Sequence, residues 1–155
     1  MTKVAYINDE AHEIKDGETV LSFLKRHSGK EDVVPTLCDS PNLKPFGSCR
    51  VCSVDVDLKQ DGPAKSMASC HTPIMENSYI YPDSKRIQKL RKNIIELVLT
   101  DHPLDSLTSE VSGNCELQTV AAKVGIREVR YPKGKDHSHV EKDLSHPYMK
   151  SDLSK

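Results

Sequence analysis

Four cysteines between residues 38 and 70 constrain this chain more than any other feature of its sequence. They are Cys38, Cys49, Cys52 and Cys70, and their spacing is C-x10-C-x2-C-x17-C. Two cysteines three positions apart on a tight loop can hold one edge of a metal centre, while two from distant segments close the other edge. The pattern predicts a four-thiolate iron–sulfur site of the [2Fe–2S] type, with two thiolates for each iron.

The loop between the cysteines has the composition that such a site requires. Gly47 lets the backbone approach sulfur closely, and Pro41 and Pro45 stiffen the loop without offering donors. Arg50 is a candidate for raising the potential or meeting a partner, and a solvated surface arginine is the alternative. Backbone N–H groups can donate to cluster sulfides from four positions, Gly47, Ser48, Arg50 and Val51.

Two other interpretations of the cysteines remain open at this stage. A structural zinc site also takes four thiolates, although it usually does so through two C-x2–4-C knuckles, and this chain has one. The thiols could also be unligated members of a core. A catalytic cysteine is not favoured, because no Cys/His/Asp constellation is evident. Asp101 and Asp105 bracket His102 without forming an obvious acid–base pair.

Composition narrows the function classes further. Of the 155 residues, 36% are apolar and none is Trp, so the core must be small and would gain from a metal. The net charge of −1, with both signs mixed along the chain, argues against a nucleic-acid partner. We expect no membrane span and no signal peptide. Five cysteines without a secretory signal then favour a reducing, cytoplasmic location.

The first 82 residues predict a small sheet with one helix. Thr19 is a suitable N-cap for a helix that ends at Ser28-Gly29. After Cys52, apolar residues at 54, 56 and 58 alternate with aspartates at 55 and 57, which predicts a half-buried strand. Further strands are expected at 4–7, 12–15, 65–68 and 78–81, and an extended segment at 33–37. The fold class is α+β, with a β-grasp, ferredoxin-like sheet.

A second, helical unit is expected after residue 82. Ser84 is a suitable N-cap for a helix to about residue 100, and Gly125 closes another helix over 115–124. The apolar face of the first of these helices is predicted at Ile87, Leu90, Ile94, Leu97 and Val98. Its basic residues, predicted to form a solvated face with a docking face as the alternative, are Lys85, Arg86, Lys89, Arg91 and Lys92. Residues 127–131 are expected to be extended. From 134 onward a solvated tail is predicted, including His137, His139 and His146.

Several motifs resemble a known family. They are PTLC at 35–38, FGSCRVC at 46–52, ASCHTP at 68–73, RIQKLRK at 86–92, DHPLD at 101–105 and CELQ at 115–118. They resemble the N-terminal [2Fe–2S] region of large iron–sulfur redox subunits. That family includes the largest peripheral subunit of respiratory complex I, [FeFe] hydrogenases, subunits of NAD-reducing hydrogenases and the alpha subunit of NAD-dependent formate dehydrogenases. Residues 124–131 most resemble the formate dehydrogenase branch.

The resemblance implies an electron carrier that is not an enzyme on its own. Its cluster would relay electrons between a formate-oxidising centre and a flavin/NAD-binding subunit. Further iron–sulfur modules and a molybdenum or tungsten domain would follow in the parent oxidoreductase. The corresponding region of a hydrogenase or of an NADH-quinone oxidoreductase is the alternative, as is a structural zinc or interaction module.

One departure from the family concerns a second cluster site. Members carry a [4Fe–4S] cluster on H-x3-C-x2-C-x5-C, and here His102 and Cys115 stand at the outer positions with Ser106 and Ser109 between them. A serine alkoxide is a poor ligand for iron, so we expect no stable [4Fe–4S] cluster. Cys115 is then a leftover thiol, and His102 a residue at a helix C-terminus, where its charged form is favoured.

The expected organisation has three parts. Residues 1–82 form the [2Fe–2S] domain, residues 83–133 form a helical domain with the vestigial site, and residues 134–155 form a tail or linker toward downstream modules. Two Cys-to-Ser differences and an end near a module boundary suggest an engineered fragment. A natural relative that lost the second cluster is the alternative.

Overall fold

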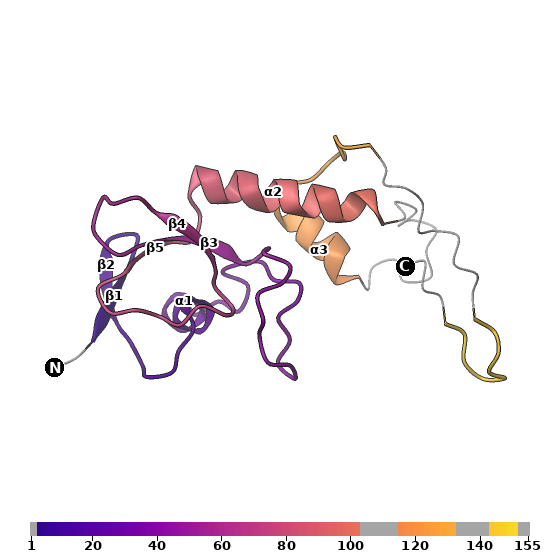
Figure 1. Ribbon diagram of the computed structural model, residues 1–155, viewed down its shortest axis with the longest axis horizontal. Helices are drawn as coiled ribbons and strands as arrows, with labels where there is room; N and C mark the ends of the chain where they lie inside the picture. Colours follow the sequence, from indigo (N-terminus) through magenta and orange to yellow (C-terminus); the bar gives the residue numbers. More distant parts are fainter. Residues whose placement is uncertain (1–2, 103–114, 133–142, 152–155) are drawn as a thin grey trace. The chain divides into compact units, whose positions relative to one another are not determined.

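The computed structural model describes residues 3–102, 115–132 and 143–151 (Figure 1). Its helices and strands are β1 (Val4–Ile7), β2 (Glu10–Glu13), α1 (Val20–Ser28), β3 (Ser53–Asp57), β4 (Lys65–Ala68), β5 (Tyr79–Tyr81), α2 (Lys85–Thr100) and α3 (Glu116–Lys123). The chain divides into two compact units, Met1–Arg91 and Lys92–Lys155. No helix among the described residues is long and apolar enough to cross a membrane.

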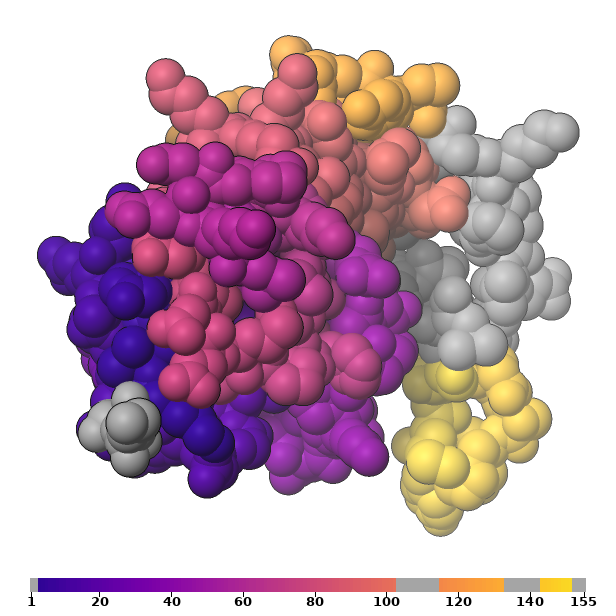
Figure 2. Space-filling view, turned by 60° about the vertical axis from the view of Figure 1, so that its left-hand side comes forward, coloured from indigo at the N-terminus to yellow at the C-terminus, as the bar shows by residue number. Residues whose placement is uncertain are grey.

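The first unit contains a five-stranded mixed sheet with the strand order β2-β1-β5-β3-β4. β1 pairs with β5 in parallel, and the other neighbours are antiparallel. In Figure 2 the indigo N-terminal residues lie beside the pink residues that contain β5, as this pairing requires. Apolar residues of α1 and of the sheet form one core, which includes Phe23, Leu24, Val54 and Ile80. This arrangement is consistent with the predicted α+β, ferredoxin-like domain.

Local signals at the ends of α1 act as predicted. The Thr19 side chain accepts a hydrogen bond from the backbone N–H of Ser22, and Ser22 caps Thr19 in return. Gly29 ends the helix in the left-handed conformation at φ 65° and donates to the carbonyl of Lys25. Both ends of the helix are therefore set by residues whose chemistry is visible in the sequence.

The prediction that β3 is half-buried is wrong. All five residues of β3 are buried, including Asp55 and Asp57, which are 4% and 5% exposed, whereas Leu58 is 61% exposed. Asp55 tolerates burial because its carboxylate accepts hydrogen bonds from Ser66, Ser84 and Arg86. These partners come from β4 and from the beginning of α2, which therefore contact the face of β3 that the alternating pattern assigned to solvent.

The helix α2 begins as predicted, because Ser84 Oγ accepts a hydrogen bond from the N–H of Ile87 at 3.2 Å. Its predicted apolar face is only partly right. The buried positions follow an i, i+4 stripe, Ile87, Arg91, Ile95 and Leu99, with Glu96 beside it. Leu97 and Val98 are exposed. The predicted solvated basic face is wrong at Arg91, which is 4% exposed.

Glu96 and Arg130 form a charged contact within the second unit. Glu96 is completely buried, and its Oε2 accepts a hydrogen bond from Arg130 Nε at 2.8 Å. Arg130 also donates to Asn93 Oδ1 at 2.8 Å. Glu96 Oε1 has no hydrogen-bond partner among the described residues. Arg130 is therefore the cation that offsets the cost of burying this carboxylate.

The other predictions for the part of the chain after α2 are only partly confirmed. Gly125 follows α3 with φ 75°, as predicted, and residues 127–131 belong to no strand. The predicted separate helical domain is not confirmed, because α2 begins in the first unit and ends in the second. His146 is exposed, in agreement with a solvated tail, whereas His137 and His139 lie outside the described residues.

The Arg130→Ala variant should loosen the second unit selectively. Removing the guanidinium leaves a buried, uncompensated carboxylate at Glu96, so amides of α3 and of the second half of α2 should exchange with deuterium roughly tenfold faster. Arg127→Ala removes an exposed arginine from the same segment and should leave exchange unchanged. Equal exchange in the two variants would contradict this role for Arg130.

Candidate metal centre

The four predicted cysteines come from three segments of the first unit. Cys38 follows the irregular stretch after α1, Cys49 and Cys52 precede β3 directly, and Cys70 follows β4. All four are free thiols. Cys52 and Cys70 are each 1% exposed and belong to the hydrophobic core, whereas Cys38 and Cys49 are partly exposed. The site therefore has a buried half and a half that faces the surface.

Contacts among the thiols join them in two pairs. The N–H of Cys49 donates to Cys38 Sγ at 3.5 Å. Cys52 and Cys70 form the other pair of neighbours, since Cys52 is, after burial, the main cause of the raised pKa of Cys70. Cys38 and Cys70 interact electrostatically, which connects the pairs. All four predicted cysteines therefore lie in one region of the first unit.

The Cys70 segment is held in place from two sides. The N–H and the Oγ of Ser69 both donate to the carbonyl of Cys52, at 3.2 and 2.7 Å. The carbonyls of Ser69 and Thr72 accept the first two N–H groups of α1, from Leu21 and Val20, at 2.9 Å each. These N–H groups have no partner inside their own helix, so the beginning of α1 and the Cys70 turn satisfy one another.

The loop before Cys49 packs closely against the same turn. His71 Nδ1 lies 3.1 Å from the carbonyl of Pro45 and donates to it. Gly47 has φ 69°, and a Cβ built on it would lie 3.3 Å from the Cβ atoms of Ala68 and His71. Both the backbone conformation and the close approach favour glycine. The close approach that the structure shows at Gly47 is to Ala68 and His71, so its predicted approach to sulfur stays a prediction.

The surroundings shift the pKa values of Cys49 and Cys70 in opposite directions. Burial acts to raise the pKa of Cys49, but hydrogen bonds from the backbone at Val51 and Cys38 and from the Cys38 side chain bring that pKa below its usual value. Burial, together with the neighbouring Cys52, raises the pKa of Cys70 to about 12. Thiols bind metals as thiolates, so occupancy of this site must release protons, and a bound cation offsets the cost of charge at Cys70.

A mononuclear site has no counterpart in the part of the chain that the structure describes, where no three His, Cys, Asp or Glu side chains are placed to hold one metal ion. Of the second predicted site, only His102 and Cys115 are described. His102 is partly buried just after α2, and its N–H donates to the carbonyl of Leu99 at 3.3 Å. Cys115 precedes α3 and makes no side-chain cap. Ser106 and Ser109 lie outside the described residues.

Arg91 lies near the site, although the sequence analysis assigned it to a solvated face and gave it no role there. It donates to the carbonyl of Ser53, the residue that follows Cys52, from Nε at 3.1 Å and from Nη2 at 2.6 Å. A signal was available in the sequence. Apolar residues recur every four positions at Ile87, Ile95 and Leu99, and Arg91 occupies the position between the first two. Arg50, the arginine that was considered, is exposed, with its backbone at φ 60°.

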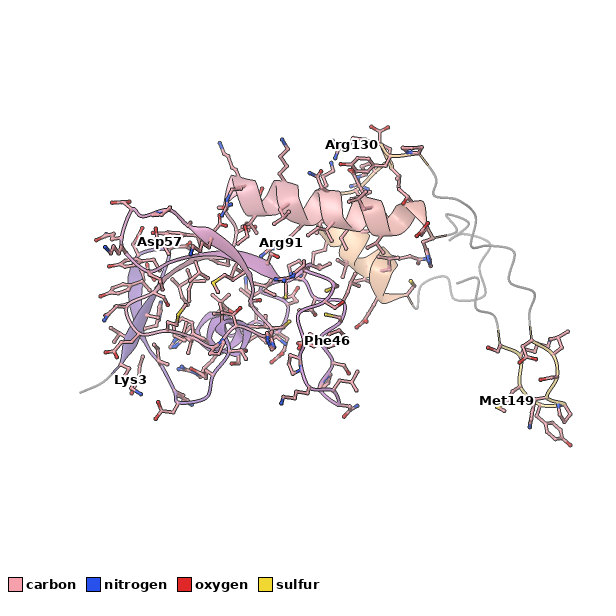
Figure 3. The ribbon with its side chains drawn as sticks, viewed as in Figure 1. Lys3, Phe46, Asp57, Arg91, Arg130 and Met149 are labelled. Carbon is pink, nitrogen blue, oxygen red and sulfur yellow. The ribbon has the colours of Figure 1, made fainter. Side chains whose placement is uncertain are left out.

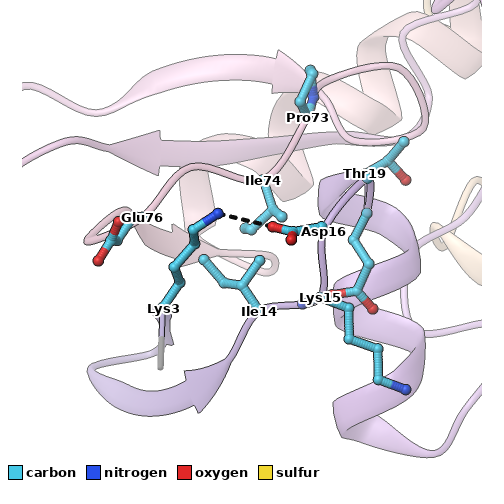
Figure 4. A pocket seen from close by; sticks show the side chains of 10 residues that line it. Lys3, Ile14, Lys15, Asp16, Thr19, Pro73, Ile74 and Glu76 are labelled. Carbon is cyan, nitrogen blue, oxygen red and sulfur yellow. Dashed lines mark hydrogen bonds and ion pairs between the residues drawn. The ribbon is translucent and has the colours of Figure 1, made fainter. Parts of the chain in front are cut away.

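A surface pocket of about 360 Å³ lies elsewhere on the first unit. The ion pair between Lys3 Nζ and Asp16 Oδ1, at 2.8 Å, crosses it, and Ile14, Pro73 and Ile74 are among its lining residues (Figure 4). None of the cysteines lines this pocket. It is therefore separate from the thiol site.

Two family models match the chain. The 2Fe-2S iron-sulfur cluster binding domain matches residues 4–85, more than half of the chain and all four clustered cysteines. The NADH-ubiquinone oxidoreductase-G iron-sulfur binding region matches residues 91–130. The second match spans His102, Ser106, Ser109 and Cys115, so the absence of a [4Fe–4S] cluster there stays a prediction.

Similar proteins are subunits of redox complexes. The chain is 37% identical over 145 residues to the NADP-reducing hydrogenase subunit HndD of Solidesulfovibrio fructosivorans, covering 90% of this chain and 23% of that protein. It is 34% identical over 138 residues to an NADH-quinone oxidoreductase subunit of Rickettsia prowazekii, covering 88% of this chain and 18% of that protein. The chain spans less than a quarter of the length of these curated relatives.

A solved structure has the same fold. The NAD⁺-reducing [NiFe]-hydrogenase in the H₂-reduced state matches 95% of this chain and 58% of its own chain, with a TM-score of 0.77 and 24% sequence identity.

The Gly47→Ala variant should lose iron on reconstitution. Its left-handed backbone costs about 1–2 kcal/mol once a Cβ is present, and the contacts with Ala68 and His71 add to that cost. Gly17→Ala is the matched control, since Gly17 has φ 81° and nothing lies within 4 Å of the place that an added Cβ would take. Iron per chain should fall in the first variant and not in the second. Equal iron content would show that the close packing at Gly47 does not support the site.

Proposed function

Because this chain belongs to the 2Fe-2S iron-sulfur cluster binding domain family, we propose that it is a one-electron transfer module. Its single [2Fe–2S] cluster is held by Cys38, Cys49, Cys52 and Cys70. The observation that carries the proposal is the gathering of these four thiols beside the beginning of β3, where the Cys49 N–H donates to Cys38 Sγ at 3.5 Å and Cys70 is a neighbour of Cys52.

The thiols present fit this group in number and arrangement. A [2Fe–2S] cluster takes four thiolates, two on each iron, and here Cys49 pairs with Cys38 while Cys70 pairs with Cys52. A zinc site would instead require the four sulfurs to surround one ion. When bound, the cluster supplies a centre that accepts and returns one electron, at a potential on the order of −400 mV for plant-type relatives.

The protein's own residues make such a centre accessible on one side only. Cys52 and Cys70 lie in the core, which excludes water from one pair of ligands. Cys38 and Cys49 are partly exposed, and the loop between them carries the exposed apolar side chains Leu43 and Phe46 (Figure 3). A redox partner that covers this loop would approach the cluster closely, which electron transfer requires.

We also propose the finer organisation expected from the sequence. The sheet and α1 form a β-grasp domain over residues 1–82, residues 83–133 form a helical domain, and residues 134–155 form a linker. At the second site Ser106 and Ser109 replace the two central cysteines of the family pattern, so it holds no [4Fe–4S] cluster.

For the parent protein we propose the alpha subunit of an NAD-dependent formate dehydrogenase in the cytoplasm. Its partners are a flavin/NAD-binding subunit and downstream iron–sulfur and molybdenum or tungsten modules. The support for this branch is the resemblance of residues 124–131. The relatives named above are hydrogenase and NADH-quinone oxidoreductase subunits, and the corresponding region of such a subunit is the second candidate. Turnover of formate against hydrogen or NADH by the whole parent complex separates the candidates.

Metal and sulfide analysis of cysteine variants tests the ligand set. The reconstituted chain should contain about two irons and two sulfides and be EPR-active only when reduced. Serine at position 38, 49, 52 or 70 should reduce or abolish this signal. Cys115→Ser is the matched control, because it removes the one cysteine outside the cluster site and should leave both iron content and EPR spectrum unchanged.

Three results would contradict the proposal. A colourless protein with zinc and no sulfide would indicate a structural site. About four further irons per chain, lost in Cys115→Ser, would show that the second site is functional. Turnover of formate, hydrogen or NADH by this chain alone would show that it is an enzyme in its own right.

A further inference from the structure

The guanidinium of Arg91 is buried next to the proposed cluster ligands. Arg91 is 4% exposed, and it reaches from α2 to the beginning of β3, where it donates to the carbonyl of Ser53 (Figure 3). It donates twice to the carbonyl of Ser53 and once to the carbonyl of Pro82, at 2.7 Å. One arginine therefore ties the residue after Cys52 to the segment that leads into α2.

We propose that Arg91 is a positioning and tuning residue for the cluster: it fixes the backbone at Cys52 and places a buried positive charge beside that ligand. The inference rests on the proposed function, since it concerns the potential of the cluster proposed there. It assigns a task to a residue that lies outside the cysteine motifs.

The charge of Arg91 is only partly offset by its neighbours. Its ion-pair partner Asp83 lies 3.8 Å away and is 72% exposed, so water screens that carboxylate. Asp55, the buried carboxylate of β3, attracts Arg91 more weakly than Asp83 does and is ion-paired with Arg86. The other contacts of Arg91 are neutral carbonyls. A net positive charge therefore remains in the interior, where it interacts with Cys52.

A positive charge in this place has a definite effect on reduction. Accepting one electron makes a cluster with four thiolates more negative by one unit, and a nearby buried cation stabilises that added charge more than an exposed cation does. Arg91 also donates two hydrogen bonds to the carbonyl of Ser53, which offset the negative end of that carbonyl beside Cys52. Both effects raise the reduction potential. Arg50, although closer in sequence to the ligands, is exposed and screened.

An EPR-monitored redox titration of the reconstituted chain tests this role. Arg91→Gln removes the charge and should lower the equilibrium constant for one-electron reduction about tenfold, which is 59 mV for a one-electron couple. Arg91→Lys keeps the charge but loses the two-pronged contact with Ser53, and should lower the constant about threefold. Lys89→Gln removes an exposed charge from the same helix and should change it less than twofold.

The outcomes separate this inference from the function on which it rests. A wild-type chain without a [2Fe–2S] signal contradicts the proposed function before any variant is compared. A normal wild-type signal, with Arg91→Gln and Lys89→Gln at the same potential, overturns the inference and leaves the function standing. If Arg91→Gln retains no cluster, Arg91→Lys decides: a threefold lower constant supports the role, and an unchanged constant overturns it.

Discussion

The meeting of four thiols at the beginning of β3 is the constraint on which the first unit depends. Two of them, Cys52 and Cys70, are members of the hydrophobic core, so the site is part of the interior rather than an attachment to it. Four thiolates in this space would repel one another and lose hydration, and the raised pKa of Cys70 expresses that cost. A bound cationic centre offsets it, which couples metal binding to the stability of the fold.

Polar contacts between α2 and β3 complete the surroundings of the site. Asp55 binds Ser84 and Arg86 at the first turn of α2, and Arg91 binds the carbonyl of Ser53 two turns later. The beginning of the helix is thus joined to the strand by hydrogen bonds and an ion pair. Such contacts are directional, and they set how the backbone after Cys52 is presented.

The sequence predicted the parts of this structure that depend on local chemistry. Thr19 and Gly29 set the two ends of α1, and Ser84 caps α2. The four cysteines can be recognised from their residue type and spacing. It failed where charged residues are buried. Asp55 and Arg91 were assigned to solvent because charge usually indicates exposure, and only the tertiary partners that neutralise or hydrogen-bond them reverse that assignment. The periodicity of apolar residues alone therefore predicted the wrong burial for one face of β3 and for part of the buried side of α2.

Mössbauer spectroscopy of the iron-loaded chain tests the central claim most directly, because it counts the iron sites and their valences. The account predicts two high-spin ferric sites coupled to a diamagnetic ground state, and, after reduction by one electron, equal amounts of one ferric and one ferrous site in sulfur coordination. A single mononuclear iron environment, or no iron bound at the four cysteines, would contradict it.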